Sequence, residues 1–398
     1  MKGVSMRKKL RIVAVAAVVG SLLLSSCGSS SGSGDDGTIR IASIAPMSGA
    51  ASVYGKSVTA AMQYAVDEKN NAGGVEVNGT KHKIDLTLFD DEQKPDVAQS
   101  VARKALDEGY NFVFGPFGSG TASASQSLMA QSEAYFQLTV AAVEGPTKNP
   151  NVFRSGARIN LYTDIALDYL KNHPEIKTVG MITDQLHTGL VSEEPRLVAG
   201  IEALGRTVVL QDKMQLGDTD FRAPLTKMLS VKPDIYLVRA YPAETVLITK
   251  QAKELGGNVP LQWSAGMTNG EVKTLVNDEA AMVNVTQATP LANLDPFLAA
   301  KDPLAETVAA GLGDKAGTFA VAAYDGMQVF FAGLESADEV SPQALQTAMS
   351  GLQTDEIKDI TIQDFRPQDS GQVFKDREVL LNAAAVRWQA GVGFVIAD

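Results

Sequence analysis

The chain has 398 residues, 45% hydrophobic and 20% charged, which is enough for about two to three globular domains. Acidic residues outnumber basic residues by 46 to 35, and this argues against a nucleic-acid partner, because nucleic-acid-binding proteins normally present a basic patch. A single cysteine excludes an intrachain disulfide, so the fold must depend on the size of its hydrophobic core.

The N-terminus has the pattern of a bacterial lipoprotein signal. Five basic residues within 2–11 precede an apolar run at 12–24, which is too short for a comfortable membrane span. The run ends in Leu24-Ser25-Ser26-Cys27, which resembles a lipobox. We therefore predict that residues 1–26 are removed and that Cys27 is lipidated. The alternative is an ordinary signal peptide with a chance cysteine.

Removal of this segment takes away five basic residues and no acidic one, so the formal net charge falls from −11 to −16. Residues 27–37 form a flexible Gly/Ser-rich tether in this interpretation. Acyl chains on Cys27 would hold the protein at the outer face of the cell membrane, since each buried CH₂ contributes about 0.8 kcal/mol. No later segment approaches 18 uninterrupted apolar residues, so no other membrane span is expected.

Strand and helix patterns alternate after the tether. Strands are predicted at 39–45, 112–115 and 135–140, with a hairpin at 75–89 that turns at Asn78-Gly79. Intervening helices are predicted at 57–70, 97–108 and 122–133.

The pattern then restarts, with strands predicted at 178–183, 207–210, 235–238, 260–264 and 282–286. Helices are predicted at 163–172, 190–204, 221–229, 243–255, 318–334 and 341–352, before a partly strand-like end. Strands that alternate with helices of this length favour parallel sheets covered on both faces. Two such sets predict two α/β lobes.

Two apparent catalytic motifs fail on inspection. The segment 49–57 follows a strand and ends in Gly-Lys-Ser, but five residues separate its glycines where a phosphate-binding loop requires four. The segment 28–32 matches a nucleophile-elbow pattern, yet it lies in the tether with no strand before it. Neither motif supports nucleotide binding or hydrolysis.

Metal and catalytic sites have equally little support. The three histidines His82, His173 and His187 lack metal-ligand spacing, so neither a metal site nor a cofactor is predicted. Asp90-Asp91-Glu92 could bind a cation, but it is interpreted as the solvated end of a strand or a helix cap. A Ser/His/Asp set formed only in space stays open, but no catalytic residue is assigned.

One segment contains residues that are suited to binding a ligand. The turn 115–121, Gly-Pro-Phe-Gly-Ser-Gly-Thr, lies between a strand and a helix. Gly120 lets the backbone approach a ligand, Ser119 and Thr121 add hydroxyls, and the amides of a helix N-terminus favour a carboxylate. Loops at the carboxyl ends of strands are also where open α/β sheets usually bind ligands. The alternative is a plain helix N-cap.

These residues resemble the type I periplasmic binding proteins of the leucine/isoleucine/valine-binding group. The similarity runs from residue 39 to about residue 388. Its markers, in chain order, are Ile44-Ala-Pro-Met-Ser-Gly49, Tyr54-Gly55, Asn71-Ala-Gly-Gly74, Leu88-Phe-Asp-Asp91, Pro95, Ala98, Phe114-Gly115-Pro116, Gly118-Ser119, Tyr241-Pro242 and Ala323-Tyr324-Asp325-Gly326.

The resemblance implies a fold of two Rossmann-like parallel-sheet lobes joined by a three-crossover hinge. We expect lobe 1 to comprise 38–158 plus 287–375, and lobe 2 to comprise 159–286 plus 376–398. The implied contacts are packing of Tyr54 on the ligand, a bond from Ser119 to its carboxylate, backbone groups around Val140–Ala142, and Tyr241 from lobe 2.

Departures from the family pattern concern the ligand's charged groups. Ala142 stands where a threonine often grips the carboxylate, Thr188 stands at a lobe-2 tyrosine, and Gly266, Ile159 or Asn160 stands where an acid usually holds the ammonium. Arg239 and Arg158 could both face the cleft. These substitutions suit an acid or amide without an α-ammonium, unless Asp184 or Glu244 supplies the negative charge from a shifted position.

The expected function is that of an extracytoplasmic, non-enzymatic binding protein that delivers an amino acid or related small carboxylate or amide to an ABC permease and its ATPase. A receptor-like sensor module and a secreted hydrolase are the two alternatives. The poverty in histidine and cysteine argues against the hydrolase.

Overall fold

The computed structural model describes residues 37–49, 51–131, 136–143, 145–290, 292–363, 365–368, 370–381 and 383–396. The predicted signal segment 1–26, Cys27 and the tether up to residue 36 lie outside the described residues. Within the described ranges, no helix has the length and apolar character needed to cross a bilayer.

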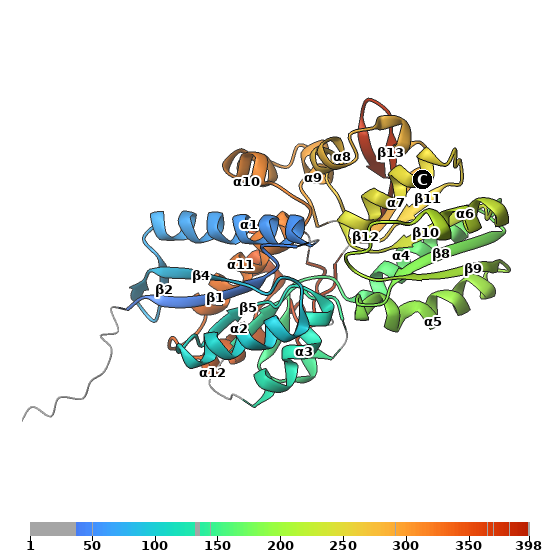
Figure 1. Cartoon of the computed structure of the whole chain (residues 1–398). Helices are drawn as coiled ribbons and strands as arrows, with labels where there is room; N and C mark the ends of the chain where they lie inside the picture. The colour runs from blue at the N-terminus through green and yellow to red at the C-terminus, as the bar shows by residue number, and fades with distance from the viewer. Residues whose placement is uncertain are drawn as a thin grey trace, which may run out of the picture. The chain divides into compact units, whose positions relative to one another are not determined.

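The first sheet has five parallel strands in the order β4-β1-β5-β6-β7. They are β1 (Ile39–Ala45), β4 (Ile84–Asp90), β5 (Phe112–Phe114), β6 (Phe136–Thr139) and β7 (Val152–Arg154). Successive side chains of a strand point to opposite faces, so Ile39 and Ile41 pack on one face and Ala42 and Ile44 on the other. Helices α1 (Ser52–Asn71) and α11 (Ala320–Glu335) cover the first face, and α2 (Pro95–Asp107) and α3 (Ser119–Ala130) cover the second (Figure 1).

The predicted hairpin is present beside this sheet. Strands β2 (Val75–Val77) and β3 (Thr80–His82) pair antiparallel. Asn78 and Gly79 have φ of 47° and 77°. Two central residues with positive φ are what a tight two-residue hairpin turn requires, so the Asn-Gly prediction is confirmed.

The second sheet has the order β14-β13-β12-β11-β10-β8-β9, and only β13 runs opposite to the other strands, antiparallel to both β12 and β14. Its strands are β8 (Thr178–Asp184), β9 (Thr207–Met214), β10 (Ile235–Arg239), β11 (Leu261–Trp263), β12 (Val285–Pro290), β13 (Ala383–Gln389) and β14 (Gly393–Ile396). Ile235 and Leu237 pack toward α4 (Ile159–Asn172) and α5 (Thr188–Ala203). The opposite face of the sheet is covered by α6 (Arg222–Val231), α7 (Pro242–Glu254) and α8 (Asn269–Leu275).

The chain passes between the two sheets three times: after β7, after β12 and before β13. The remaining elements are α9 (Asp295–Ala299), α10 (Pro303–Leu312), α12 (Pro342–Gly351), α13 (Thr354–Ile357) and the 3₁₀ turns η1 (Pro146–Lys148), η2 (Glu279–Met282) and η3 (Gly313–Lys315). The predicted class, two α/β lobes with parallel sheets, is confirmed. The lobe boundaries remain predictions, and the one after residue 286 falls inside β12.

Several element bounds differ from the prediction. Helix α3 begins at Ser119, three residues early, because the glycine-rich turn forms its first helical turn. Strand β9 extends to Met214, beyond the predicted end at 210. It is an edge strand in which exposed positions alternate with less exposed ones. Most of its exposed positions hold polar residues, so the apolar pattern that predicts a strand is weak there. The short elements β7, α8 and α9 were not predicted.

Candidate ligand-binding site

A small cavity of about 40 Å³ lies between elements of the two sheets. Its wall is contributed by Tyr54, Phe117, Gly118, Ser119, Val140, Ala142, Tyr162, His187, Leu190, Ala240, Tyr241, Ser264 and Phe319. Most of these residues lie within six positions after the carboxyl ends of β5, β6, β8, β10 and β11. This is the position where open parallel sheets bind their ligands.

Aromatic rings make up much of the wall. The Tyr54 ring meets Phe319 edge-on with centroids 4.7 Å apart and lies 5.8 Å from Phe117, while Phe117 and Phe319 are 5.0 Å apart. On the opposite side, the Tyr241 ring stacks on His187 at 4.8 Å. Such rings supply a large apolar surface of defined shape. The cavity therefore suits an apolar body.

The tyrosine hydroxyls stay protonated. Burial raises the pKa of Tyr54 well above its ordinary value, although a hydrogen bond with the Gly266 backbone partly offsets this. Burial raises the pKa of Tyr162 to about 12 and raises that of Tyr241 further. At neutral pH these groups are uncharged and can donate hydrogen bonds to a ligand.

A hydrogen bond joins the two sides of the cavity. Gln93, in the loop after β4, donates from Nε2 to the hydroxyl of Tyr241 at 2.9 Å. The loop is held in a strained form, because Glu92 and Gln93 have φ of 51° and 58°. The backbone N–H groups of these two residues donate to Asp90 Oδ1 at 2.8 Å and Asp91 Oδ1 at 2.9 Å. The loop thus points Gln93 at the other side of the cavity.

Gly118 makes room for this bond. A Cβ at position 118 would lie 1.8 Å from Gln93 Nε2, well inside any real contact. A second connection lies at Thr318, just before α11, whose Oγ1 is 2.6 Å from Glu271 Oε2 on α8 and 2.9 Å from the Gly266 carbonyl. Together these contacts hold the two sides of the cavity against each other.

The structure brings five of the ten predicted ligand residues to the wall: Tyr54, Ser119, Val140, Ala142 and Tyr241. Four others lie next to the cavity without lining it. Gly266 contacts Tyr54, Gly120 packs near the Leu186 carbonyl, Thr121 donates to the Gly118 carbonyl, and Thr188 is an exposed residue of α5.

Arg239 lies behind the wall. It shares a face of β10 with Ile235 and Leu237, and its Nη2 donates to the Leu190 carbonyl on α5 at 2.6 Å. The side chain is 4% exposed, and among the described residues no carboxylate lies within 4.0 Å of it. Burial lowers its pKa to about 10. Arg239 therefore adds positive charge beneath the cavity rather than a direct contact.

Asp184 and Glu244 do not supply a carboxylate to the wall. Asp184 Oδ1 accepts hydrogen bonds from the backbone N–H groups of Leu186 and Leu216, and Glu244 Oε1 accepts one from Gly217. Burial raises the pKa of both carboxyl groups. These two groups hold the loops that follow β8 and β9. Arg158 is the residue before α4 and is also absent from the wall.

Eight wall residues were not predicted from the sequence: Phe117, Gly118, Tyr162, His187, Leu190, Ala240, Ser264 and Phe319. Three of them, Gly118, His187 and Ala240, adjoin positions that had been singled out, at 119, 188 and 241. His187 is one residue from Thr188, so the wall includes the predicted segment through the neighbouring residue. Tyr162 and Phe319 carry no local signal.

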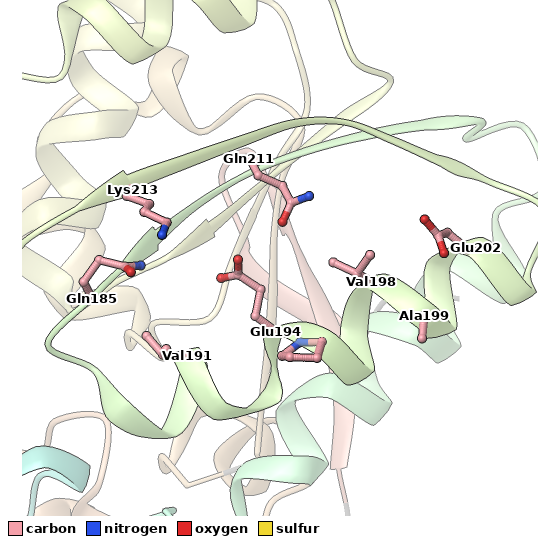
Figure 2. A pocket seen from close by; sticks show the side chains of 9 residues that line it. Gln185, Val191, Glu194, Val198, Ala199, Glu202, Gln211 and Lys213 are labelled. Carbon is pink, nitrogen blue, oxygen red and sulfur yellow. The ribbon is translucent and has the colours of Figure 1, made fainter.

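A larger hollow of about 490 Å³ lies between α5 and β9. Figure 2 shows Glu194 on α5 and Gln211 and Lys213 on β9 facing one another across it. All of its wall residues come from α5, β9 and the loop between β8 and α5. It lacks the convergence of both sheets that marks the smaller cavity.

Comparisons with known proteins agree with this architecture. The family described as "Periplasmic binding protein" matches residues 38–379. The Leu/Ile/Val-binding protein BraC3 of Rhizobium johnstonii is 30% identical over 314 residues, which cover 78% of this chain and 83% of the relative.

Solved structures share the fold. The branched-chain amino acid transporter substrate-binding protein LivJ of Streptococcus pneumoniae, in complex with isoleucine, superposes with a TM-score of 0.70 at 20% identity, over 90% of this chain and 100% of that one. An ABC transporter solute-binding protein of Rhodopseudomonas palustris, in complex with 4-hydroxybenzoate, has a TM-score of 0.73 at 17% identity, over 91% and 96%. The chain belongs to the type I periplasmic binding proteins, in the family of the leucine/isoleucine/valine-binding proteins.

Proposed function

We propose that this protein is the extracytoplasmic solute-binding component of an ABC importer and encloses an amino acid or a related small carboxylate or amide between its lobes. The observation that carries the proposal is the convergence of residues from both sheets on one cavity at the carboxyl ends of their strands. Named relatives that bind leucine, isoleucine and valine support the amino-acid class.

Within this proposal, Tyr54 packs on the ligand, Ser119 and the backbone near Val140 and Ala142 hold its carboxylate, and Tyr241 closes from the other lobe. Ser119 is the first residue of α3, where unpaired helix amides favour an anion. No catalytic residue or cofactor is required for this function.

Binding requires the lobes to separate and close. The cavity of about 40 Å³ is far smaller than the roughly 300–1,000 Å³ of ordinary small-molecule sites, so an amino-acid-sized solute must enter a more open form. Contacts to both lobes form only on closure, so the ligand shifts the population toward the closed form. A permease with its ATPase then recognises that closed form.

Calorimetric titration with leucine, isoleucine, valine and their des-amino acids tests the ligand class. We expect saturable one-to-one binding of at least one of these compounds. A matching rise in thermal stability is expected too, because a ligand that binds only the folded form adds about 2.7 kcal/mol at a hundredfold excess over its Kd. If none of them, and no member of a broader library of small acids and amides, stabilises the protein, the solute-binding proposal fails.

Lipidation of Cys27 is part of the same proposal and is tested separately. In a bacterial host the intact chain is expected in the membrane fraction, labelled by palmitate and released only by detergent. Cys27→Ser should abolish the label and the retention, because the lipid is attached through that thiol and the acyl chains hold the protein at the membrane. Ser26→Ala is the matched control, since it leaves the cysteine in place. Retention of Cys27→Ser in the membrane would contradict the anchor.

A further inference from the structure

His187 is the wall residue whose chemistry the proposed function does not yet use. It directly precedes α5, and its ring lies on the cavity wall, stacked on Tyr241 with an interplanar angle of 27°. Imidazole is the one wall group that can present a donor, an acceptor or a positive charge. Its protonation state therefore decides what the cavity recognises.

The structure determines which nitrogen carries the proton. The backbone N–H of Leu190 donates to His187 Nδ1 at 3.3 Å, so the ring caps the N-terminus of α5. A neutral imidazole has one acceptor nitrogen and one N–H. Because Nδ1 accepts, the proton must be on Nε2.

The surroundings keep this ring neutral. Burial lowers the pKa of His187 to about 4, and the charge of Arg239 acts in the same direction. The N-terminal end of α5 also disfavours a positive charge. At neutral pH the ring is thus a donor at Nε2 without a net charge.

The rest of the wall has no charged side chain to pair with a cation. The thirteen residues that line the cavity include neither a carboxylate nor an Arg or Lys. Apart from the His187 imidazole, their polar side-chain groups are hydroxyls, and the Oγ of Ser264 is buried without a hydrogen-bond partner in the described structure. Arg239 lies directly behind Leu190, and it forms no salt bridge within the described ranges, although the charges of Glu194 and Glu193 act on it. A buried ammonium without a carboxylate costs several kcal/mol, whereas a ligand oxygen can accept from the imidazole.

We propose that His187 is a specificity-determining ligand residue that donates from Nε2 to a carboxylate or carbonyl oxygen, so that the cavity selects small acids without an α-ammonium group. This rests on the proposed function and names the solute class of the same site. His187 thereby takes the place that the sequence pattern had given to Thr188.

The test compares matched ligand pairs by calorimetry: leucine with 4-methylpentanoate, and phenylalanine with 3-phenylpropanoate. The acid of a pair is expected to bind at least about tenfold more tightly than its amino acid. His187→Phe keeps a ring against Tyr241 but removes the donor. His187→Asn keeps an acceptor for the Leu190 N–H and controls for loss of the cap. Both substitutions should weaken acid binding by about tenfold, which corresponds to the net free energy of one hydrogen bond.

His173→Phe is the control for a general effect of replacing a histidine. His173 directly follows the C-terminal end of α4 and does not line the cavity, so this substitution should leave the affinity unchanged. Nitrogen NMR of histidine-labelled protein gives a readout that does not depend on a ligand. The signals lost in His187→Phe should show a protonated Nε2 and an unprotonated Nδ1.

Four results would each overturn the inference: a protonated Nδ1, tighter binding of the amino acid than of its acid, failure of both acids to bind, or unchanged acid affinity in both His187 variants. If amino acids bind while acids do not, only the inference fails, and the solute-binding function stands. If no small solute binds at all, the proposed function itself fails.

Discussion

Replacing Gly118 with alanine is expected to weaken solute binding by about ten- to a hundredfold, the largest effect of any single added methyl group at the cavity. The new Cβ would lie 1.8 Å from Gln93 Nε2 and 2.6 Å from its Cδ. Gln93 cannot easily retreat, because its backbone is held in the left-handed region and its side chain is only 6% exposed. It must therefore release Tyr241, and the closed form loses a bond between its two sides.

Calorimetry with the tightest of the titrated solutes measures this loss, and small-angle scattering reports the matching fall in the closed fraction. Gly351→Ala is the control, since a Cβ there meets nothing within 4 Å. In a Gln93→Ala background the Gly118→Ala change should have little further effect, because the clashing amide is gone. Affinity of Gly118→Ala within twofold of the unmodified protein would show that the Gln93–Tyr241 bond does not support closure.

Arg154→Leu is expected to lower the free energy of unfolding by about 3–5 kcal/mol, because it leaves the partner of a buried ion pair without its counter-charge. Arg154 is the last residue of β7, just before the first passage between the sheets, and is fully buried. Its Nε lies 3.0 Å from Glu378 Oε2, and its Nη2 donates to the Val143 carbonyl at 2.6 Å. The pair thus ties this passage to the C-terminal part of the chain.

Denaturant unfolding followed by circular dichroism measures the loss. The control is Lys358→Met, which breaks the ion pair with Asp355. Those two side chains are 60% and 88% exposed, so this change should leave the free energy of unfolding nearly unchanged. If Arg154→Leu and Lys358→Met changed the free energy of unfolding equally, the buried ion pair would contribute no more to stability than the exposed one.

The sequence predicted the architecture because the signals for it are local. The apolar run at 39–45 and the Asn78-Gly79 turn depend on near neighbours, and both appear as expected. The glycine-rich turn at Ser119 was placed at the cavity from its position between a strand and a helix. The strand ends of two parallel sheets were enough to predict the position of this cavity, where a ligand is expected to bind.

The direction in which individual side chains point could not be predicted from the sequence. Arg239 ends a strand as predicted, but strand alternation puts it on the same face as Ile235 and Leu237, under α5 and behind the cavity. The start of α5 decides that His187, rather than Thr188, forms the wall. A shift of one residue at a strand or helix end exchanges inside for outside.

The sequence by itself determined the fold class, the family and the glycine-rich turn, since these follow from periodicity and from motifs of near neighbours. Only the tertiary structure decided that Gln93 reaches Tyr241 and that Tyr162 and Phe319 join the same wall. Gln93 and Tyr241 lie 148 positions apart. Contacts between such distant residues depend on how the two sheets close against each other, and no local pattern in the chain encodes that.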